Sequence, residues 1–87
     1  MVPHFEGRDS AQFLADLKKL DPPLQRRILE AIETKLLEGP FKHSKKLVWK
    51  TGPGRWRFGV GDYRIRFDIQ GGTLLFYRVR HRREIYE

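Results

Sequence analysis

Cysteine is absent from the 87 residues, which excludes both a disulfide framework and a zinc site built on thiolates. No run of about 18 apolar residues occurs, and the N-terminus does not combine a charged start with an apolar segment. Neither a membrane span nor a secretory signal is therefore predicted. Glycine-rich phosphate loops and histidine pairs at metal-ligand spacing are also missing. We expect a cytoplasmic protein that uses no metal and no small-molecule cofactor.

Acidic residues are scarce in only one part of the chain. Residues 1–41 carry a net charge of −1, whereas residues 42–87 hold twelve lysines and arginines against four acids and carry +8. The whole chain has a formal charge of +7 and a pI near 10.1. A basic surface on one part of a small domain is typical of a protein that binds a polyanion, most often a nucleic acid. No helix is both basic and strongly amphipathic, so a membrane partner is not expected.

The hydrophobic pattern predicts a single domain, residues 1–87, of the α+β class. Apolar residues recur at helical spacing in two stripes that are separated by Asp21 and Pro22, and the second stripe ends at Gly39. From Lys45 onward apolar and polar residues alternate, as in strands. We expect two N-terminal helices, an αα-hairpin, packed on one face of a small, mainly antiparallel sheet of three to four strands.

Local sequence gives further expectations about the sheet. If the N-terminal segment forms a strand, Pro3 predicts that the strand lies at the sheet edge. Residues 46–49 suggest a short strand. Residues 74–76 are apolar without alternation, which indicates a strand that is covered on both sides or carries a β-bulge. The side of the sheet on which Arg78 and Arg80 lie stays open at this point.

The segment RWRFGVGDYRIRF, residues 55–67, predicts a β-hairpin with one apolar face and one arginine face. Gly61 and Asp62 suit a two-residue turn. That turn fixes the cross-strand neighbours, which are Val60 with Tyr63, Phe58 with Ile65, Gly59 with Arg64 and Arg57 with Arg66.

The arginine face is the informative one. Like charges directly opposite each other in a hairpin are destabilising, so Arg57 facing Arg66 indicates a site for an anion. Gly59 has no side chain and leaves room for a ligand to approach. The alternative interpretation is a solvated basic face, balanced in part by Asp68 opposite Arg55.

The functional groups of the basic half suit the cleavage of RNA. The 2′-hydroxyl of RNA can attack the neighbouring phosphorus and expel the 5′-oxygen without a metal. A protein then has to orient the strand, stabilise the charge of the transition state and move two protons. Arginine suits the charge because its guanidinium stays protonated. His81 and Tyr86 are the candidates for proton transfer, with a surface histidine and an aromatic lid on the core as the alternatives.

Two helices, a segment reading RFGVGDYRIRF, a glycine turn, an apolar strand and a closing HRREIY together resemble the RelE/ParE family of small toxins from bacterial and archaeal toxin–antitoxin pairs. The likeness extends over nearly the whole chain from about Ser10. It implies antiparallel strands backed by two helices, with a basic concave face as the working surface. For the RelE branch it also implies cleavage of messenger RNA in the ribosomal A site. The implied partners are the ribosome, the mRNA and a cognate antitoxin.

The resemblance further implies roles for individual residues. Arg64, the arginine of GDYR, corresponds to a residue that clamps the transition state. Arg82 corresponds to the arginine that follows the histidine. Tyr86 corresponds to a residue that acts as an acid, a base or a stacking group. Several members carry lysines on the preceding strand, where this chain has arginines. Since arginine is not deprotonated in proteins, the role of the base shifts toward His81. The expected catalytic set is Arg57, Arg64, His81, Arg82 and Tyr86. The side chains expected to bind RNA phosphates are Lys45, Lys46, Lys50, Arg55, Arg66, Arg80 and Arg83.

Two other functions stay open on the sequence. A ParE-like protein would poison DNA gyrase and cleave nothing, although the histidine, arginine and tyrosine near the C-terminus favour the nuclease. An RNA-binding domain without catalysis would bind with an affinity that falls steeply with salt.

Overall fold

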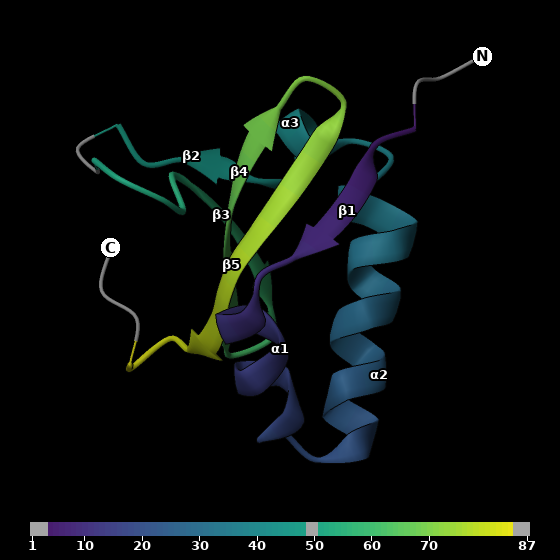
Figure 1. Ribbon diagram of the computed structural model, residues 1–87. Helices are drawn as coiled ribbons and strands as arrows, with labels where there is room; N and C mark the ends of the chain where they lie inside the picture. The colour runs from purple at the N-terminus through teal and green to yellow at the C-terminus, as the bar shows by residue number, and fades with distance from the viewer. Residues whose placement is uncertain (1–3, 49–50, 85–87) are drawn as a thin grey trace.

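The computed structural model describes residues 4–48 and 51–84, which form an α+β fold (Figure 1). Within these residues five strands make one mixed sheet in the order β1-β5-β4-β3-β2. Strand β1 runs parallel to β5, and every other neighbouring pair is antiparallel. The elements in chain order are β1 (Glu6–Asp9), α1 (Ala11–Lys18), α2 (Pro22–Ala31), the π-helical turn η1 (Ile32–Leu36), α3 (Pro40–His43), β2 (Lys45–Lys46), β3 (Trp56–Val60), β4 (Tyr63–Gln70) and β5 (Thr73–His81).

The predicted fold class is confirmed, but the predicted sheet is too small and the helices are not the first elements. Strand β1 precedes them, and all four of its residues are exposed, so it lacks the alternation that marks a strand. Its parallel pairing with β5 joins segments far apart in sequence (Figure 1). The expected edge position is confirmed. The strand suggested for residues 46–49 is shorter and begins earlier, at Lys45.

Local signals define the helices. The Ser10 hydroxyl accepts a hydrogen bond from the Phe13 N–H at 3.0 Å and caps α1. Pro22 follows the N-cap Asp21, at a position where a missing N–H costs nothing. The stripe of α2 continues through η1, where the Leu37 N–H reaches the Ile32 carbonyl at 2.9 Å. No helix among the described residues is long and apolar enough to cross a membrane.

The hairpin of β3 and β4 has the predicted register: Arg57 faces Arg66, and Gly59 faces Arg64. Gly61 in its turn has a φ of 58°, a conformation that favours glycine. The apolar run at residues 74–76 was expected to be covered on both sides or to carry a β-bulge. The β4–β5 register shifts between Arg66 and the next residue, so a bulge lies directly after that run.

One face of the sheet packs against the helices to form the core. Its buried side chains come from both layers and are Phe13, Leu17, Ile28, Ile32, Leu36, Phe58, Val60, Ile65, Phe67, Leu74, Phe76 and Val79. Since successive side chains on a strand point to opposite faces, the residues between the core positions of β3 and β4 lie on the other face. The core therefore sets where the arginines of the hairpin lie.

Candidate functional site

A row of cationic residues crosses four adjacent strands on the face opposite the core side chains of the sheet. The register places Lys45 opposite Arg57, Arg57 opposite Arg66, and Arg66 opposite Arg78. Neighbouring strands are about 4.8 Å apart, so the row is roughly 14 Å long. A second row places Arg64 between Gly59 and Arg80. The register thus answers the question left open by the sequence for β5.

Two members of the first row are used for structure. Arg66 is only 3% exposed, and its Nε donates to the Gly54 carbonyl at 2.8 Å, which fixes the turn before β3. Arg78 donates from Nε and Nη2 to the Asp16 carboxylate at 2.7 and 3.1 Å. The same carboxylate accepts the Val79 N–H at 3.2 Å, so it holds Arg78 against α1. Arg66, which was expected to bind an RNA phosphate, is thus almost fully buried and bonded to backbone.

A basic pocket of ≈ 460 Å³ opens beside the remaining cations. It lies where α3 and the start of β2 meet the hairpin, and no carboxylate is among its lining residues. Its volume falls in the range of ligand sites in proteins. The lining residues are Lys42, His43, Ser44, Lys45, Arg57, Gly59, Gly61 and Arg64. We call this hollow the basic pocket.

The Arg64 guanidinium is held in place by the hairpin turn. Its Nη1 donates to the Gly61 carbonyl at 2.9 Å and to the Tyr63 carbonyl at 3.1 Å. It also lies over Gly59, where an added Cβ would be 3.1 Å from Nη1. Gly59 does not have a positive φ, so an added side chain would press on the Arg64 guanidinium and would not strain the backbone. The gap expected from the sequence is therefore filled by a positioned guanidinium, which is the group that best binds phosphate oxygens.

The basic pocket brings together some of the residues expected from the sequence and separates others. Lys45, Arg57 and Arg64 line it. Lys46 and Arg55 instead line a second hollow of ≈ 440 Å³ near the turn at residues 52–54.

Asp68, which the sequence pairs with Arg55, binds backbone instead of the guanidinium. Its two carboxylate oxygens accept the N–H groups of Gly54 and Arg55 at 2.7 and 2.9 Å.

His81 does not share the basic pocket. It faces Tyr63 on the neighbouring strand, and the two rings meet edge to face at 5.4 Å between centroids. Because Tyr63 and Arg64 are consecutive on β4, they point to opposite faces of the sheet. His81 therefore lies on the helix side, and its Nδ1 accepts the Arg83 N–H at 3.2 Å. His81, toward which the role of the base was expected to shift, therefore lies on the other face of the sheet from Arg57 and Arg64.

The remaining expected residues follow β5. Arg80 faces Arg64 and forms an exposed ion pair with Glu84 at 3.3 Å. The Arg82 N–H donates to the Asp62 carbonyl at 2.7 Å, which brings Arg82 to the turn of the hairpin. Arg83 is exposed. Tyr86 and Lys50 lie outside the described residues.

His43 is the site residue that sequence reasoning missed. It lies at the end of the short helix α3 and is exposed at the basic pocket. The run KHSKK at residues 42–46 starts the basic half of the chain and was a usable signal. Its spacing matches no known motif, so only the packing of α3 beside β3 shows which side chains it meets.

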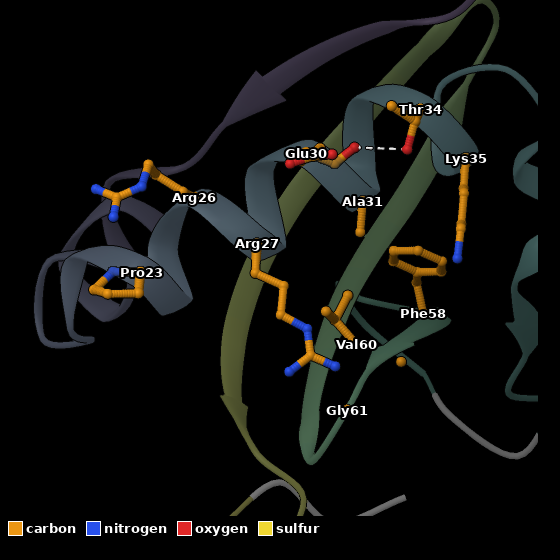
Figure 2. A pocket seen from close by; sticks show the side chains of 11 residues that line it. Pro23, Arg26, Arg27, Glu30, Ala31, Thr34, Lys35, Phe58, Val60 and Gly61 are labelled. Atoms are coloured by element: carbon orange, nitrogen blue, oxygen red, sulfur yellow. Dashed lines mark hydrogen bonds between the residues drawn. The ribbon is translucent and has the colours of Figure 1, made fainter.

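A groove on the other side of the hairpin adjoins the basic pocket. It has a volume of ≈ 600 Å³ and lies between α2 and β3. Figure 2 shows Arg27 of α2 reaching toward Val60 and Gly61, with Lys35 and Phe58 further along. The groove and the basic pocket share Gly59 and Gly61. Whatever fills the groove therefore lies next to the basic pocket.

The family of ParE toxins of type II toxin–antitoxin systems, parDE, matches the chain over residues 9–86. The chain belongs to the RelE/ParE family of toxins of type II toxin–antitoxin systems. This toxin is 35% identical over 78 residues to Toxin RelE3 of Methanocaldococcus jannaschii, which corresponds to 86% of this chain and 88% of the relative.

Solved structures agree with the RelE-like character of the toxin. The toxin–antitoxin complex RelBE2 from Mycobacterium tuberculosis is similar with a TM-score of 0.81 and 25% identity, over 90% of this chain and 98% of that one. The RelB–RelE antitoxin–toxin complex from Methanococcus jannaschii has a TM-score of 0.67 and 29% identity, over 90% and 93% of the two chains. The chain is therefore a RelE-like toxin of a toxin–antitoxin system.

Proposed function

We propose that this toxin is a ribosome-dependent mRNA endoribonuclease, which inhibits translation by cutting mRNA in the ribosomal A site. The observation that carries the proposal is the basic pocket, where Lys45, Arg57 and Arg64 meet with no carboxylate among the lining residues. A surface that gathers so many like charges is suited to a phosphodiester. The ribosome would present one codon of single-stranded RNA to this face.

The proposed reaction needs no metal. The 2′-oxygen of one nucleotide attacks the adjacent phosphorus, a 2′,3′-cyclic phosphate forms, and the bond to the 5′-oxygen breaks. Arg64, positioned by the turn carbonyls, binds the phosphoryl oxygens as negative charge develops on them. Arg57 stabilises the same charge from the neighbouring strand.

The C-terminal end supplies the other groups. Arg82 lies at the hairpin turn and binds the flanking phosphate, together with Arg80 and Arg83. Tyr86, which lies outside the described residues, donates the proton to the leaving 5′-oxygen or stacks on a base.

An in-vitro translation extract tests the proposal. Wild-type toxin should cut mRNA at the A-site codon, as seen by primer extension. Arg64→Ala should slow cutting by roughly 100-fold or more, because it removes a preorganised donor to the transition state. Arg8→Ala is the matched control, since Arg8 is exposed on the far edge strand β1. EDTA at magnesium concentrations that keep ribosomes intact should leave cutting unchanged. Equal cutting by Arg64→Ala and wild type would refute the assignment of the site.

A second function is a DNA gyrase inhibitor, which is favoured by one observation: the matching family is described as ParE toxins. A supercoiling assay separates the two. Inhibition of gyrase while mRNA in the translation extract stays intact would decide for the gyrase inhibitor.

The cognate antitoxin is the second proposed partner. The groove beside α2 has an apolar floor of Ala31, Phe58 and Val60, and its rim carries Arg26, Arg27 and Lys35 against one acid, Glu30. An amphipathic antitoxin segment with acidic residues fits this surface. Since the groove shares two glycines with the basic pocket, the bound segment would also obstruct access to the pocket.

Antitoxin binding can be tested at one rim residue. Arg27→Glu should weaken the binding of the antitoxin by about tenfold or more, through like-charge repulsion. Arg8→Glu is the control. Titration of labelled toxin with purified antitoxin gives the affinities, and equal affinities for wild type and Arg27→Glu would place the antitoxin elsewhere.

A further inference from the structure

We propose that His43 is the general base of this toxin, which accepts the proton of the attacking 2′-hydroxyl. The inference rests on the proposed nuclease function and names the residue that completes it. Its starting point is the placement of His43 in the same pocket as Arg57 and Arg64.

The other groups of the basic pocket do not suit this role. Arg57 and Arg64 carry guanidinium groups, which are not deprotonated in proteins. Lys42 and Lys45 are exposed ammonium groups, which act toward phosphate as point charges. The Ser44 hydroxyl donates to the Pro40 carbonyl. Imidazole, in contrast, is the side chain that ordinarily exchanges protons near neutral pH.

The short helix α3 fixes the backbone of His43, one of the residues that line the pocket. The N–H of His43 donates to the Gly39 carbonyl at 3.1 Å, which closes the turn of α3. The ring lies over Gly39, whose added Cβ would be 3.5 Å from Cδ2. Pro40 is buried and anchors the start of the same helix. A short, anchored helix therefore delivers this histidine.

The charged groups that line the pocket with His43 come from four elements. Lys42 lies on the same helix, Lys45 on β2, Arg57 on β3 and Arg64 on β4. None of these four groups is an acid. The phosphodiester brings the first negative charge into the pocket. Its arrival stabilises the imidazolium that forms when the proton is transferred.

His43 and either Tyr86 or water handle the two protons that move in the reaction. His43 takes the proton from the 2′-hydroxyl while the oxygen forms a bond to phosphorus. The bond between phosphorus and the 5′-oxygen breaks, and the 5′-oxygen leaves with the electron pair and takes a proton from Tyr86 or water. The products are a 2′,3′-cyclic phosphate and a 5′-hydroxyl. The imidazolium then returns its proton to water.

Single-turnover cleavage at saturating ribosomes, measured between about pH 5.5 and 8.5, tests the inference. For wild type the rate should rise with pH and then level off, as expected for an imidazole base. His43→Gln should cut about 100-fold more slowly or worse and lose this rise. His4→Gln, a change of an exposed histidine near β1, should match wild type. A thermal melt of each variant checks that the fold is kept.

Chemical rescue separates a catalytic from a structural role. His43→Ala opens space in the basic pocket, and added imidazole should restore cleavage by about tenfold or more, in proportion to the neutral form of the imidazole. His43→Gln with the rate and pH profile of wild type would overturn the inference. A loss of cleavage activity in His81→Gln instead of His43→Gln would also overturn the inference. The same holds if imidazole fails to restore cleavage by folded His43→Ala. If wild type itself cuts no mRNA on ribosomes, the proposed function fails first, and the inference fails with it.

Discussion

Replacing Asp16 by alanine should destabilise the toxin more than any exposed charge substitution. The Asp16 carboxylate is 8% exposed and accepts two hydrogen bonds from Arg78 and one from the Val79 N–H. The hydrogen bond to Asp16 is also the main reason why the pKa of Arg78 is raised, an effect that partial burial of the guanidinium opposes. A raised pKa favours the charged arginine in the folded state at every pH below the ordinary pKa of arginine. The contribution of Arg78 is therefore constant across neutral pH.

The magnitude follows from what each group loses. Hydrogen bonds to charged groups contribute about 1.5 to 3 kcal/mol to stability. Because Arg78 is 26% exposed, its guanidinium can bind water once Asp16 is gone, so the loss of its hydrogen bonds costs an amount near the lower end of this range. The buried Val79 N–H is left without its acceptor, which costs about 1 to 2 kcal/mol. The sum is about 3 kcal/mol. For a domain of this size that corresponds to a fall in Tm of roughly 12 to 24 °C.

Urea unfolding followed by circular dichroism measures the effect. Glu84→Ala is the control, because it removes an exposed ion pair with Arg80 and should cost less than about 1 kcal/mol. A double-mutant cycle with Arg78→Ala should give a coupling free energy of about 1 kcal/mol or more. A loss below about 1 kcal/mol in Asp16→Ala would refute the view that this carboxylate fixes α1 to β5.

Three further predictions concern the hairpin and the first helix. Gly59→Ala should slow mRNA cleavage by about tenfold with little change in Tm, because the new Cβ pushes on the tip of Arg64. Gly72→Ala is the control and should change neither the cleavage rate nor Tm, because a Cβ added at Gly72 would have no neighbouring atom within 4 Å. Ser10→Ala should lower the free energy of unfolding by about 1 kcal/mol, measured in urea, through the lost cap of α1; no loss would show that the cap is dispensable. Asp68→Ala should cost about 2 kcal/mol and speed proteolysis at the 52–54 turn, because Asp68 accepts the N–H groups of Gly54 and Arg55; an unchanged digestion pattern would contradict this.

Part of the candidate site could be predicted from sequence because it depends on neighbours along the chain. A two-residue turn fixes the register of a hairpin, and the register alone set Arg64 opposite Gly59. The same logic does not reach the histidines, because their neighbours in space come from other parts of the chain. His43 and His81 both lie in basic surroundings in the sequence; His81 belongs to the HRREIY segment that carries the family resemblance, whereas His43 belongs to no recognisable motif. Only the packing of α3 against the hairpin places His43 in the pocket.

The sequence by itself determined the α+β class, the stripes of the helices, the hairpin and the concentration of positive charge after residue 41. Each of these depends on spacing within a few residues, which periodicity and turn geometry report directly. The tertiary structure decided that β1 pairs with β5, that Arg66 is buried against a turn and that Asp16 takes Arg78. These contacts join segments far apart along the chain, and their free energy comes from burial and ion pairing that exist only once the layers have packed.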